Sequence, residues 1–168
     1  KDSRERDADR MSPRQAWRAI QDGLPKDAII SSDIGNNCAI GNAYPTFEEG
    51  RKYLAPGLFG PCGYGLPSIA GAKIACPDTP VVGFAGDGAF GISMNEMTAI
   101  GRDDWPPITM VIFRNYQWGA EKRNTTLWYD NNFVGTELNP NLSYAKVAEG
   151  CGLKGVQATT MEELTTAL

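Results

Sequence analysis

Residues 81–101, VVGFAGDGAFGISMNEMTAIG, contain the feature that most constrains the fold: an apolar strand, a glycine-rich turn and a helix in direct succession. The G-x-G-x-x-G spacing from Gly86 to Gly91 is typical of a turn that carries the diphosphate of a dinucleotide. Its second position, however, is Asp87. A carboxylate beside a diphosphate is repelled, and burial strengthens the repulsion, unless a cation lies between the two. A diphosphate held through a metal ion is therefore favoured over direct nucleotide binding.

Strands and helices alternate along the rest of the chain. This alternation predicts an α/β fold with an open parallel sheet, helices on both faces and a Rossmann-like three-layer arrangement. Right-handed crossovers place the C-terminal ends of such strands at one edge, where ligands bind. The predicted strands are residues 27–33, 81–85, 108–113 and 155–158. The predicted helices are residues 12–23, 66–75, 93–100, 143–150 and 161–168, and residues 42–65 and 116–140 are predicted to be long connections.

The strand that follows the glycine turn ends in Arg114-Asn115. A Rossmann nucleotide site expects an acid for the ribose there, so the pattern is a poor match to that function. Asn115 instead offers a neutral oxygen at the same sheet edge as Asp87. One or two protein oxygens, completed by phosphate oxygens and water, are what Mg²⁺ prefers. The turn at Asp33-Ile-Gly35 ends a third strand on that edge, with main-chain N–H groups that suit phosphate.

Composition excludes several classes of protein. The chain has 168 residues, enough for one domain, and contains no histidine, so serine–histidine triads and HExxH metalloproteases are excluded. A net charge of −4 argues against nucleic-acid binding. No apolar run approaches the ~20 residues that span a bilayer, and no signal-peptide pattern is present. The four scattered cysteines are read as buried thiols of a reducing compartment, so a cytoplasmic location is expected.

The chain divides into a charged linker, residues 1–11, and one domain, residues 12–168. It begins with Lys1 and stops inside a helical pattern. We interpret it as a fragment of a longer chain; the alternative is a mature protein with an unremarkable tail.

Three segments resemble landmarks of the thiamine-diphosphate-dependent enzyme superfamily of the acetolactate synthase and decarboxylase type. The GDG turn followed by Asn115 is similar to its GDG…NN signature. Residues 63–72, GYGLPSIAGA, are similar to its GxGLPxAxGA run, and residues 32–35, SDIG, to its TDxG turn. The resemblance covers residues 12–168 and implies the C-terminal, diphosphate-binding domain, with thiamine diphosphate and Mg²⁺ as cofactors.

The resemblance also implies roles for individual residues. Mg²⁺ would be bound by Asp87, Asn115 and the main-chain carbonyl of Gln117. Gly60 would accept a hydrogen bond from the aminopyrimidine, and Cys62 would lie under the bent cofactor. The residues implied in cofactor binding are Gly35, Asn36, Gly60, Cys62, Gly86, Asp87, Gly88, Ala89, Asn115, Gln117 and Gly119, of which Gly35, Asn36, Gly88 and Ala89 would contact the diphosphate.

This chain departs from the family pattern at two positions. Arg114 replaces the first asparagine of NN, and Cys62 replaces a larger apolar residue. The family's catalytic glutamate belongs to a separate pyrimidine-binding domain, usually on the partner subunit. A homo-oligomer, dimer or tetramer, is therefore implied, and the fragment alone is expected to be inactive.

Within the superfamily, three segments are most similar to the sulfoacetaldehyde acetyltransferase family: residues 53–64, 115–122 and 132–138. That family, which acts in taurine and sulfonate degradation, converts sulfoacetaldehyde and phosphate into acetyl phosphate and sulfite. Both substrates are small anions, for which Arg114, Lys122 and Arg123 are either binding residues or solvated surface charges. Two alternatives stay open: the same domain of another thiamine enzyme, such as acetolactate synthase or sulfopyruvate decarboxylase, and a non-catalytic Rossmann-type nucleotide-binding module.

Overall fold

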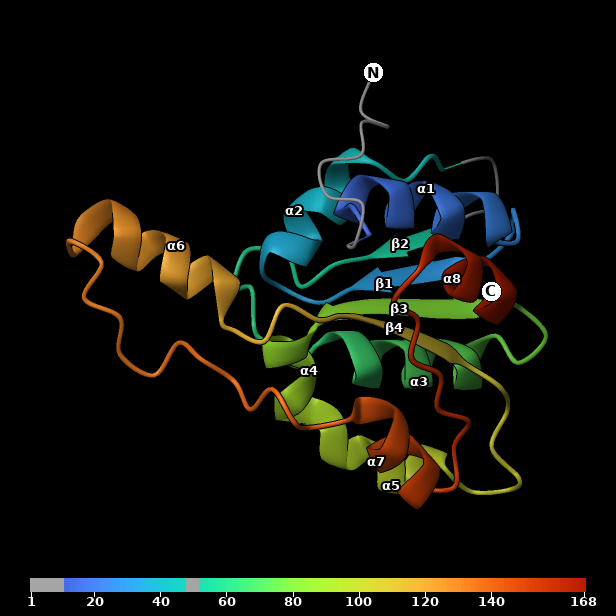
Figure 1. Ribbon diagram of the computed structural model, residues 1–168. Coiled ribbons are helices and arrows are strands. Elements are labelled where there is room, and N and C mark those ends of the chain that lie inside the picture. The colour runs from blue at the N-terminus through green and yellow to red at the C-terminus, as the bar shows by residue number, and fades with distance from the viewer. Residues whose placement is uncertain (1–10, 48–51) are drawn as a thin grey trace.

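The structure is a computed structural model, and it describes residues 11–47 and 52–168. Its centre is a four-stranded sheet in the order β2-β1-β3-β4, in which every neighbouring pair is parallel (Figure 1). The predicted open parallel sheet is thus confirmed. The strands are β1 (Ile29–Ser32), β2 (Lys52–Leu54), β3 (Val81–Gly86) and β4 (Thr109–Phe113).

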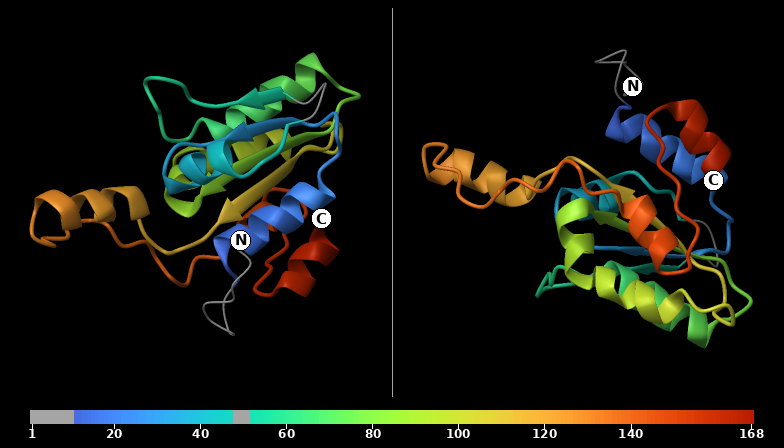
Figure 2. Two further views of the ribbon diagram at one scale, coloured as in Figure 1. Left: turned by 90° about the horizontal axis from the view of Figure 1, so that it is seen from above. Right: turned by 60° about the horizontal axis from the view of Figure 1, so that its bottom comes forward.

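Helices cover both faces of the sheet, which confirms the three-layer prediction (Figures 1 and 2). One face is covered by α1 (Pro13–Gly23), α2 (Asn36–Ala43) and α8 (Met161–Ala167). The other face is covered by α3 (Gly65–Ala75), α4 (Asp87–Ser93), α5 (Met97–Ile100) and α7 (Tyr144–Gly150), with the short 3-10 turn η1 (Met94–Glu96) between α4 and α5. Among the described residues, no helix is long and apolar enough to cross a membrane.

Two apolar cores flank the sheet because successive strand residues point to opposite faces. Ile30, Val82 and Phe84 pack beneath α1 and α8, whereas Ile29 and Val81 pack against α3 and α5. These strands are buried on both faces, as expected of a parallel sheet covered by helices.

Helix α1 begins as its sequence predicts. Ser12 and Gln15 form a capping box, and Pro13 occupies the first turn. Its buried face centres on Trp17, whose ring lies 4.5 Å from that of Phe84. The predicted linker, residues 1–11, falls outside the described residues except for Met11, which packs against the α1 core.

Four local predictions were wrong or incomplete. The helix after the glycine turn begins at Asp87, not near 93, because burial of Phe90 outweighs the low helix propensity of the glycines. Residues 36–54 contain α2 and β2, and the connection 116–140 contains α6 (Gly119–Trp128). The predicted strand at 155–158 is absent, since Val156 is 55% exposed and the segment pairs with no strand.

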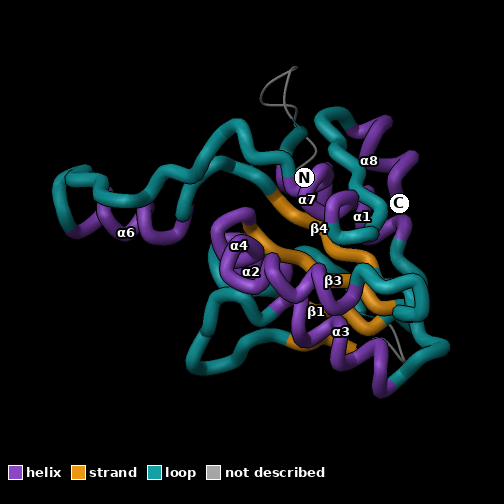
Figure 3. The backbone as a smooth tube through the Cα atoms, turned by 90° about the horizontal axis from the view of Figure 1, so that it is seen from below, coloured by secondary structure: helices purple, strands orange, loops and turns teal. Residues whose placement is uncertain are grey.

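Three strand ends meet at one edge of the sheet. Asp33 follows β1, Asp87 follows β3, and Arg114-Asn115 follow β4. The strand order changes direction between β1 and β3, and at such a switch point a parallel sheet opens a crevice for ligands. Beyond β4, residues 116–140, here called the arm, carry α6 away from the body of the domain (Figure 3). The edge with the predicted site residues is thus also the edge from which the arm leaves.

Replacing Gly101 by alanine should destabilise the domain by about 1–3 kcal/mol or more, because a rigid backbone cannot give way to the new methyl group. A Cβ at this position would lie 1.7 Å from the main-chain oxygen of Cys151, where α5 and α7 meet end to end. Thermal denaturation is the measurement. Gly150→Ala is the matched control, since nothing lies within 4 Å of its Cβ position. Equal midpoints for the two variants would contradict this account of the α5–α7 contact.

Candidate functional site

Asp87 is the central acid of the strand-end edge. It is only 2% exposed, yet it lies at the start of α4, immediately after β3. Its Oδ2 accepts a hydrogen bond of 2.7 Å from the main-chain N–H of Tyr116, and its Oδ1 accepts one of 3.1 Å from that of Gly88. Burial raises the pKa of the Asp87 carboxyl, and these N–H groups offset only part of that effect. The carboxylate therefore lies where a cation would stabilise it.

The turn after β4 brings Asn115 to the same place. Tyr116 adopts φ = 63°, a left-handed conformation that is uncommon for a residue other than glycine. The Tyr116 N–H donates to Asp87, and the left-handed conformation turns the following chain away from the strand direction. The Asn115 Oδ1 then accepts from the N–H of Gln117 at 3.3 Å. Asp87 and the segment 115–117 thus form one local cluster.

Gln117 pairs with Glu137 in an isolated antiparallel bridge at the base of the arm. The hydrogen bonds of the bridge are made by the flanking residues, Trp118 N–H to Thr136 O and Leu138 N–H to Tyr116 O, both 2.8 Å. Gln117 therefore occupies a non-hydrogen-bonded position, at which its N–H and C=O point away from the partner strand. Its N–H donates to the Asn115 side chain, and neither its N–H nor its carbonyl is used by the bridge.

Two glycines allow the segments to approach closely. A Cβ on Gly88 would lie 2.8 Å from the Trp118 ring. One on Gly119 would lie 2.8 Å from the Asn115 Nδ2 and 3.2 Å from the Asn36 Nδ2. Asn36 opens α2 after β1, so the segments that follow β1 and β4 approach each other at Gly119. The structure thereby places Asn36, Asn115 and Gly119 close together, with Gly88 against the neighbouring Trp118.

Asp33 fixes the loop that carries Gly60 and Cys62. Its side chain is fully buried, and Oδ1 accepts from the N–H groups of Ile34 (2.8 Å) and Gly63 (3.0 Å). Oδ2 accepts from the N–H of Gly65 at 2.7 Å. The sequence places Asp33 in a phosphate turn but does not predict this role, since the partners lie about thirty residues away. An acid directly after a buried strand is the only sequence signal for it.

The loop pinned by Asp33 places Gly60 and Cys62 beside the strand ends. Gly60 has φ = 55°. A Cβ added to Gly60 would lie 3.2 Å from the Cδ1 of Ile34, the residue that follows Asp33. Burial is the main influence that raises the pKa of the Cys62 thiol, and the charges of Asp33 and Glu121 add to it. Cys62 therefore lies near the end of β1 and the start of α6 as a protonated, half-buried thiol. All four cysteines of the chain are free.

The sequence also missed Tyr144, from α7. Its hydroxyl donates to the main-chain oxygen of Asp87 at 3.0 Å, and its ring meets that of Phe90 edge-on at 5.4 Å. Asp87 is thus held through its backbone as well as its side chain. A tyrosine 57 residues away at the start of a helix carries no local signal of such a contact.

The predicted cationic residues have different environments. Lys122 forms an ion pair with Glu137 and lies 5.0 Å from the centroid of Phe133. Arg114 donates to the main-chain oxygen of Pro140 at 3.0 Å. Arg123 is exposed on α6. Arg114 and Lys122 thus hold segments of the arm together. These contacts favour a structural role for the two side chains over substrate binding.

The ligand chemistry fits Mg²⁺ better than a transition metal. Within residues 11–47 and 52–168, no group of three His, Cys, Asp or Glu side chains is placed to hold a metal ion. One carboxylate with neutral amide and carbonyl oxygens leaves coordination positions for phosphate oxygens and water, which is the arrangement Mg²⁺ prefers.

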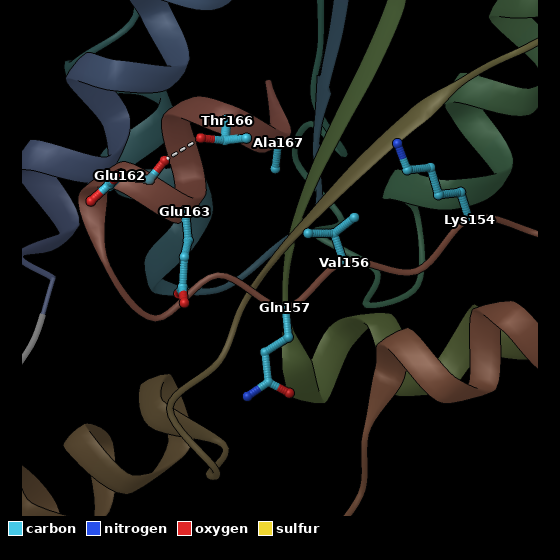
Figure 4. Close-up of a pocket in the computed structure, with 7 residues that line it drawn as sticks. All are labelled: Lys154, Val156, Gln157, Glu162, Glu163, Thr166 and Ala167. Carbon is cyan, nitrogen blue, oxygen red and sulfur yellow. Dashed lines mark hydrogen bonds between the residues drawn. The ribbon is translucent and has the colours of Figure 1, made fainter.

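A separate pocket lies beside α8 and contains none of the predicted site residues. Figure 4 shows Glu162, Glu163 and Gln157 around it, with Thr166 turned toward Glu162. Seven residues line it, and all of them lie between Lys154 and Ala167. The strand-end edge is the candidate site because the buried acid and the close backbone approaches are there.

Residues 33–168 match the family profile described as thiamine pyrophosphate enzyme, C-terminal TPP binding domain. The chain is 83% identical over 166 residues to a Rhizobium meliloti protein named "Probable sulfoacetaldehyde acetyltransferase" and 78% identical over 160 residues to the sulfoacetaldehyde acetyltransferase of Roseovarius nubinhibens. These alignments cover 99% and 95% of this chain but 28% and 26% of those proteins, so the chain spans little more than a quarter of their length.

Among solved structures, the chain is similar to the Rhodococcus jostii RHA1 thiamine diphosphate-dependent 4-hydroxybenzoylformate decarboxylase. The TM-score is 0.85 at 26% identity, covering 99% of this chain and 31% of that one. The sheet, the strand-end site and these similarities agree, and the chain belongs to the C-terminal TPP-binding domain family of thiamine pyrophosphate enzymes.

Proposed function

We propose that this chain is the diphosphate- and Mg²⁺-binding domain of a sulfoacetaldehyde acetyltransferase, which converts sulfoacetaldehyde and phosphate into acetyl phosphate and sulfite. Asp87 is the observation that carries the metal-dependent part of the proposal. Its carboxylate is buried at the end of β3, where burial raises its pKa and a divalent cation would reverse the cost of its charge. The reaction is proposed from the 83% identity to the Rhizobium meliloti relative.

The metal would be bound by Asp87, Asn115 and the Gln117 carbonyl. Support comes from the turn at Tyr116, which gathers these groups, and from the bridge that leaves the Gln117 carbonyl unpaired with Glu137. Gly35, with φ = 114°, opens α2, and the first N–H groups of a helix have no partner within it. The diphosphate would be surrounded by Gly35, Asn36, Gly86, Gly88 and Ala89. Gly119 would let the side chains of Asn36 and Asn115 approach each other, because it has no side chain of its own.

When bound, thiamine diphosphate would supply the carbon nucleophile that the reaction of an aldehyde carbonyl needs. The chain's own task is to hold and orient that group. Gly60 would accept a hydrogen bond from the aminopyrimidine through its main-chain oxygen. Cys62 would support the bent form of the cofactor, and its raised thiol pKa keeps it uncharged for that role. Asp33 holds both residues by fixing their loop.

The rest of the active site would come from outside this chain, which we propose is a fragment with a linker at residues 1–11. A glutamate from a pyrimidine-binding domain would complete the site in a dimer or tetramer. Surfaces for such contacts are present: Leu58 and Phe59 are 103% and 98% exposed, and Leu127, Trp128 and Val134 of the arm are exposed as well. We also propose small anionic substrates and a cytoplasmic location, the latter supported by the free thiols.

The two alternatives have less support. Acetolactate synthase or another thiamine enzyme would share the fold and the metal cluster, but the high identity to two acetyltransferases favours the reaction proposed here. A non-catalytic Rossmann module is disfavoured by the buried Asp87, because a dinucleotide held without metal would be repelled by it.

Asp87→Asn should reduce Mg²⁺-dependent thiamine diphosphate affinity in the full-length enzyme by at least about 100-fold. The amide keeps the size and one acceptor oxygen but removes the charge that the cation needs. Titration calorimetry measures the effect, with the exposed Asp103→Asn as a matched control. Unchanged affinity in Asp87→Asn would exclude the metal assignment.

Gly119→Ala should weaken Mg²⁺ and cofactor binding by roughly tenfold without unfolding the protein. The new methyl group would lie 2.8 Å from the Asn115 side-chain amide and displace it from the cluster. The loss is of the size seen when groups that orient metal ligands are altered. Gly150→Ala provides the control. If Gly119→Ala bound normally, the Asn115 side chain would not be a ligand.

The isolated 168-residue chain should release no sulfite from sulfoacetaldehyde and phosphate, even at saturating thiamine diphosphate and Mg²⁺. The proposed pyrimidine-domain glutamate supplies acid–base catalysis, which contributes roughly 10²–10⁴ in rate. Sulfite production is compared with that of the full-length enzyme at equal molar concentration. Comparable turnover by the short chain would show that no second domain is needed.

A further inference from the structure

Arg114 makes contacts that its position in the metal-binding pattern does not explain. It lies one residue beyond β4 and is half-buried. Its Nη2 donates to the Pro140 carbonyl at the far end of the arm, 3.0 Å away. Its Cζ lies 4.4 Å from the ring centroid of Tyr116 and 5.7 Å from that of Tyr144, both within reach of a cation–π interaction. One guanidinium thus joins the start of the arm, its end and α7.

Both tyrosines that Arg114 contacts form hydrogen bonds to Asp87. The Tyr116 N–H donates to the carboxylate at 2.7 Å, and the Tyr144 hydroxyl donates to the main-chain oxygen at 3.0 Å. Tyr116, the donor of the first bond, adopts φ = 63°, a conformation that costs free energy for a residue with a side chain. Such a conformation persists only when surrounding contacts determine it. The Arg114 guanidinium over the Tyr116 ring is one of those contacts.

We propose that Arg114 is a positioning residue, which holds Asp87, Asn115 and Gln117 in their metal-binding arrangement through Tyr116 and Tyr144. This inference rests on the proposed function, because it assumes that the cluster binds Mg²⁺ with thiamine diphosphate. Arg114 acts on the main chain of the turn and need not touch the ion, the cofactor or the substrate.

The chemistry of the contact requires arginine. A planar guanidinium stacks on a ring and donates to a carbonyl at the same time, and no other cationic side chain combines these geometries. Lysine keeps the charge and a donor but loses the planar stacking. Glutamine keeps a donor and loses the charge. The two substitutions therefore separate the contributions of the stacked cation and of the hydrogen bond to Pro140.

The test uses the full-length enzyme and measures cofactor affinity and kcat separately. Arg114→Gln should weaken Mg²⁺ and thiamine diphosphate binding by roughly 10–100-fold, as for groups that orient metal ligands, while kcat at saturating cofactor stays within about twofold. Arg114→Lys should restore part of the affinity. Arg102→Gln is the matched control, since Arg102 precedes β4 at the opposite edge and is exposed in an ion pair with Asp104. It should bind as the wild type does.

A second readout needs no cofactor. In the metal-free protein, the Tyr116 amide should exchange hydrogen faster in Arg114→Gln than in the wild type, because its bond to Asp87 would open more often. Tyr116→Gly completes a double-mutant cycle with Arg114→Gln, since glycine adopts a positive φ without strain. In that background, Arg114→Gln should have a much smaller effect on affinity than it has alone.

The possible outcomes separate this inference from the function on which it rests. A wild-type enzyme without Mg²⁺-dependent thiamine diphosphate binding overturns both. Normal binding by the wild type with unchanged cofactor affinity in Arg114→Gln overturns the positioning role alone. A lower kcat or a higher KM for sulfoacetaldehyde or phosphate, at unchanged cofactor affinity, means that Arg114 contacts substrate, and also overturns it. If Arg114→Gln does not fold, Arg114→Lys decides by the same criteria.

Discussion

The buried carboxylate of Asp87 is the constraint on which the rest of the site depends. A lone acid at the end of a central strand is costly to bury, and its hydrogen bonds compensate for only part of that cost. Three features surround it: the left-handed turn at Tyr116, the hydroxyl of Tyr144 and Gly88, the second residue of α4. Each provides a polar contact or space, and none provides a positive charge. A divalent cation with its own anionic ligand completes such a site electrostatically.

The two strand-end aspartates show how similar residues perform different tasks. Asp33, after β1, is surrounded by the N–H groups of Ile34, Gly63 and Gly65, so both of its oxygens are used to close a loop. Asp87, after β3, accepts from Tyr116 and from its own neighbour Gly88. The first is a structural anchor, and the second keeps coordination capacity for a ligand. Both flank the point where the strand order reverses, so the anchored loop and the proposed metal cluster lie at the same switch point of the sheet.

Much of the architecture could be predicted from sequence because its signals are local. Apolar runs gave β1, β3 and β4, the capping box gave α1, and the GDG turn with Asn115 identified the edge that carries the site. Helix α6 could not be predicted in this way, since it buries no residue and shows no apolar face. The helical start at Asp87 required knowledge that Phe90 enters the core. Asp33 and Tyr144 act on partners far along the chain, and one sequence carries no signal for such pairs.

The arm connects the proposed metal cluster to exposed apolar side chains that a partner could contact. A ten-residue helix without buried side chains is marginal by itself in water. The arm is held at its base by the Gln117–Glu137 bridge and by Lys122, which pairs with Glu137 and lies over Phe133. Beyond that base, Leu127 and Trp128 stay exposed. A partner that buries these side chains would order the arm, and the bridge would transmit that order to Gln117. If Asp87, Asn115 and Gln117 bind the metal as proposed, assembly and metal binding would depend on the same short stretch of main chain at the base of the arm.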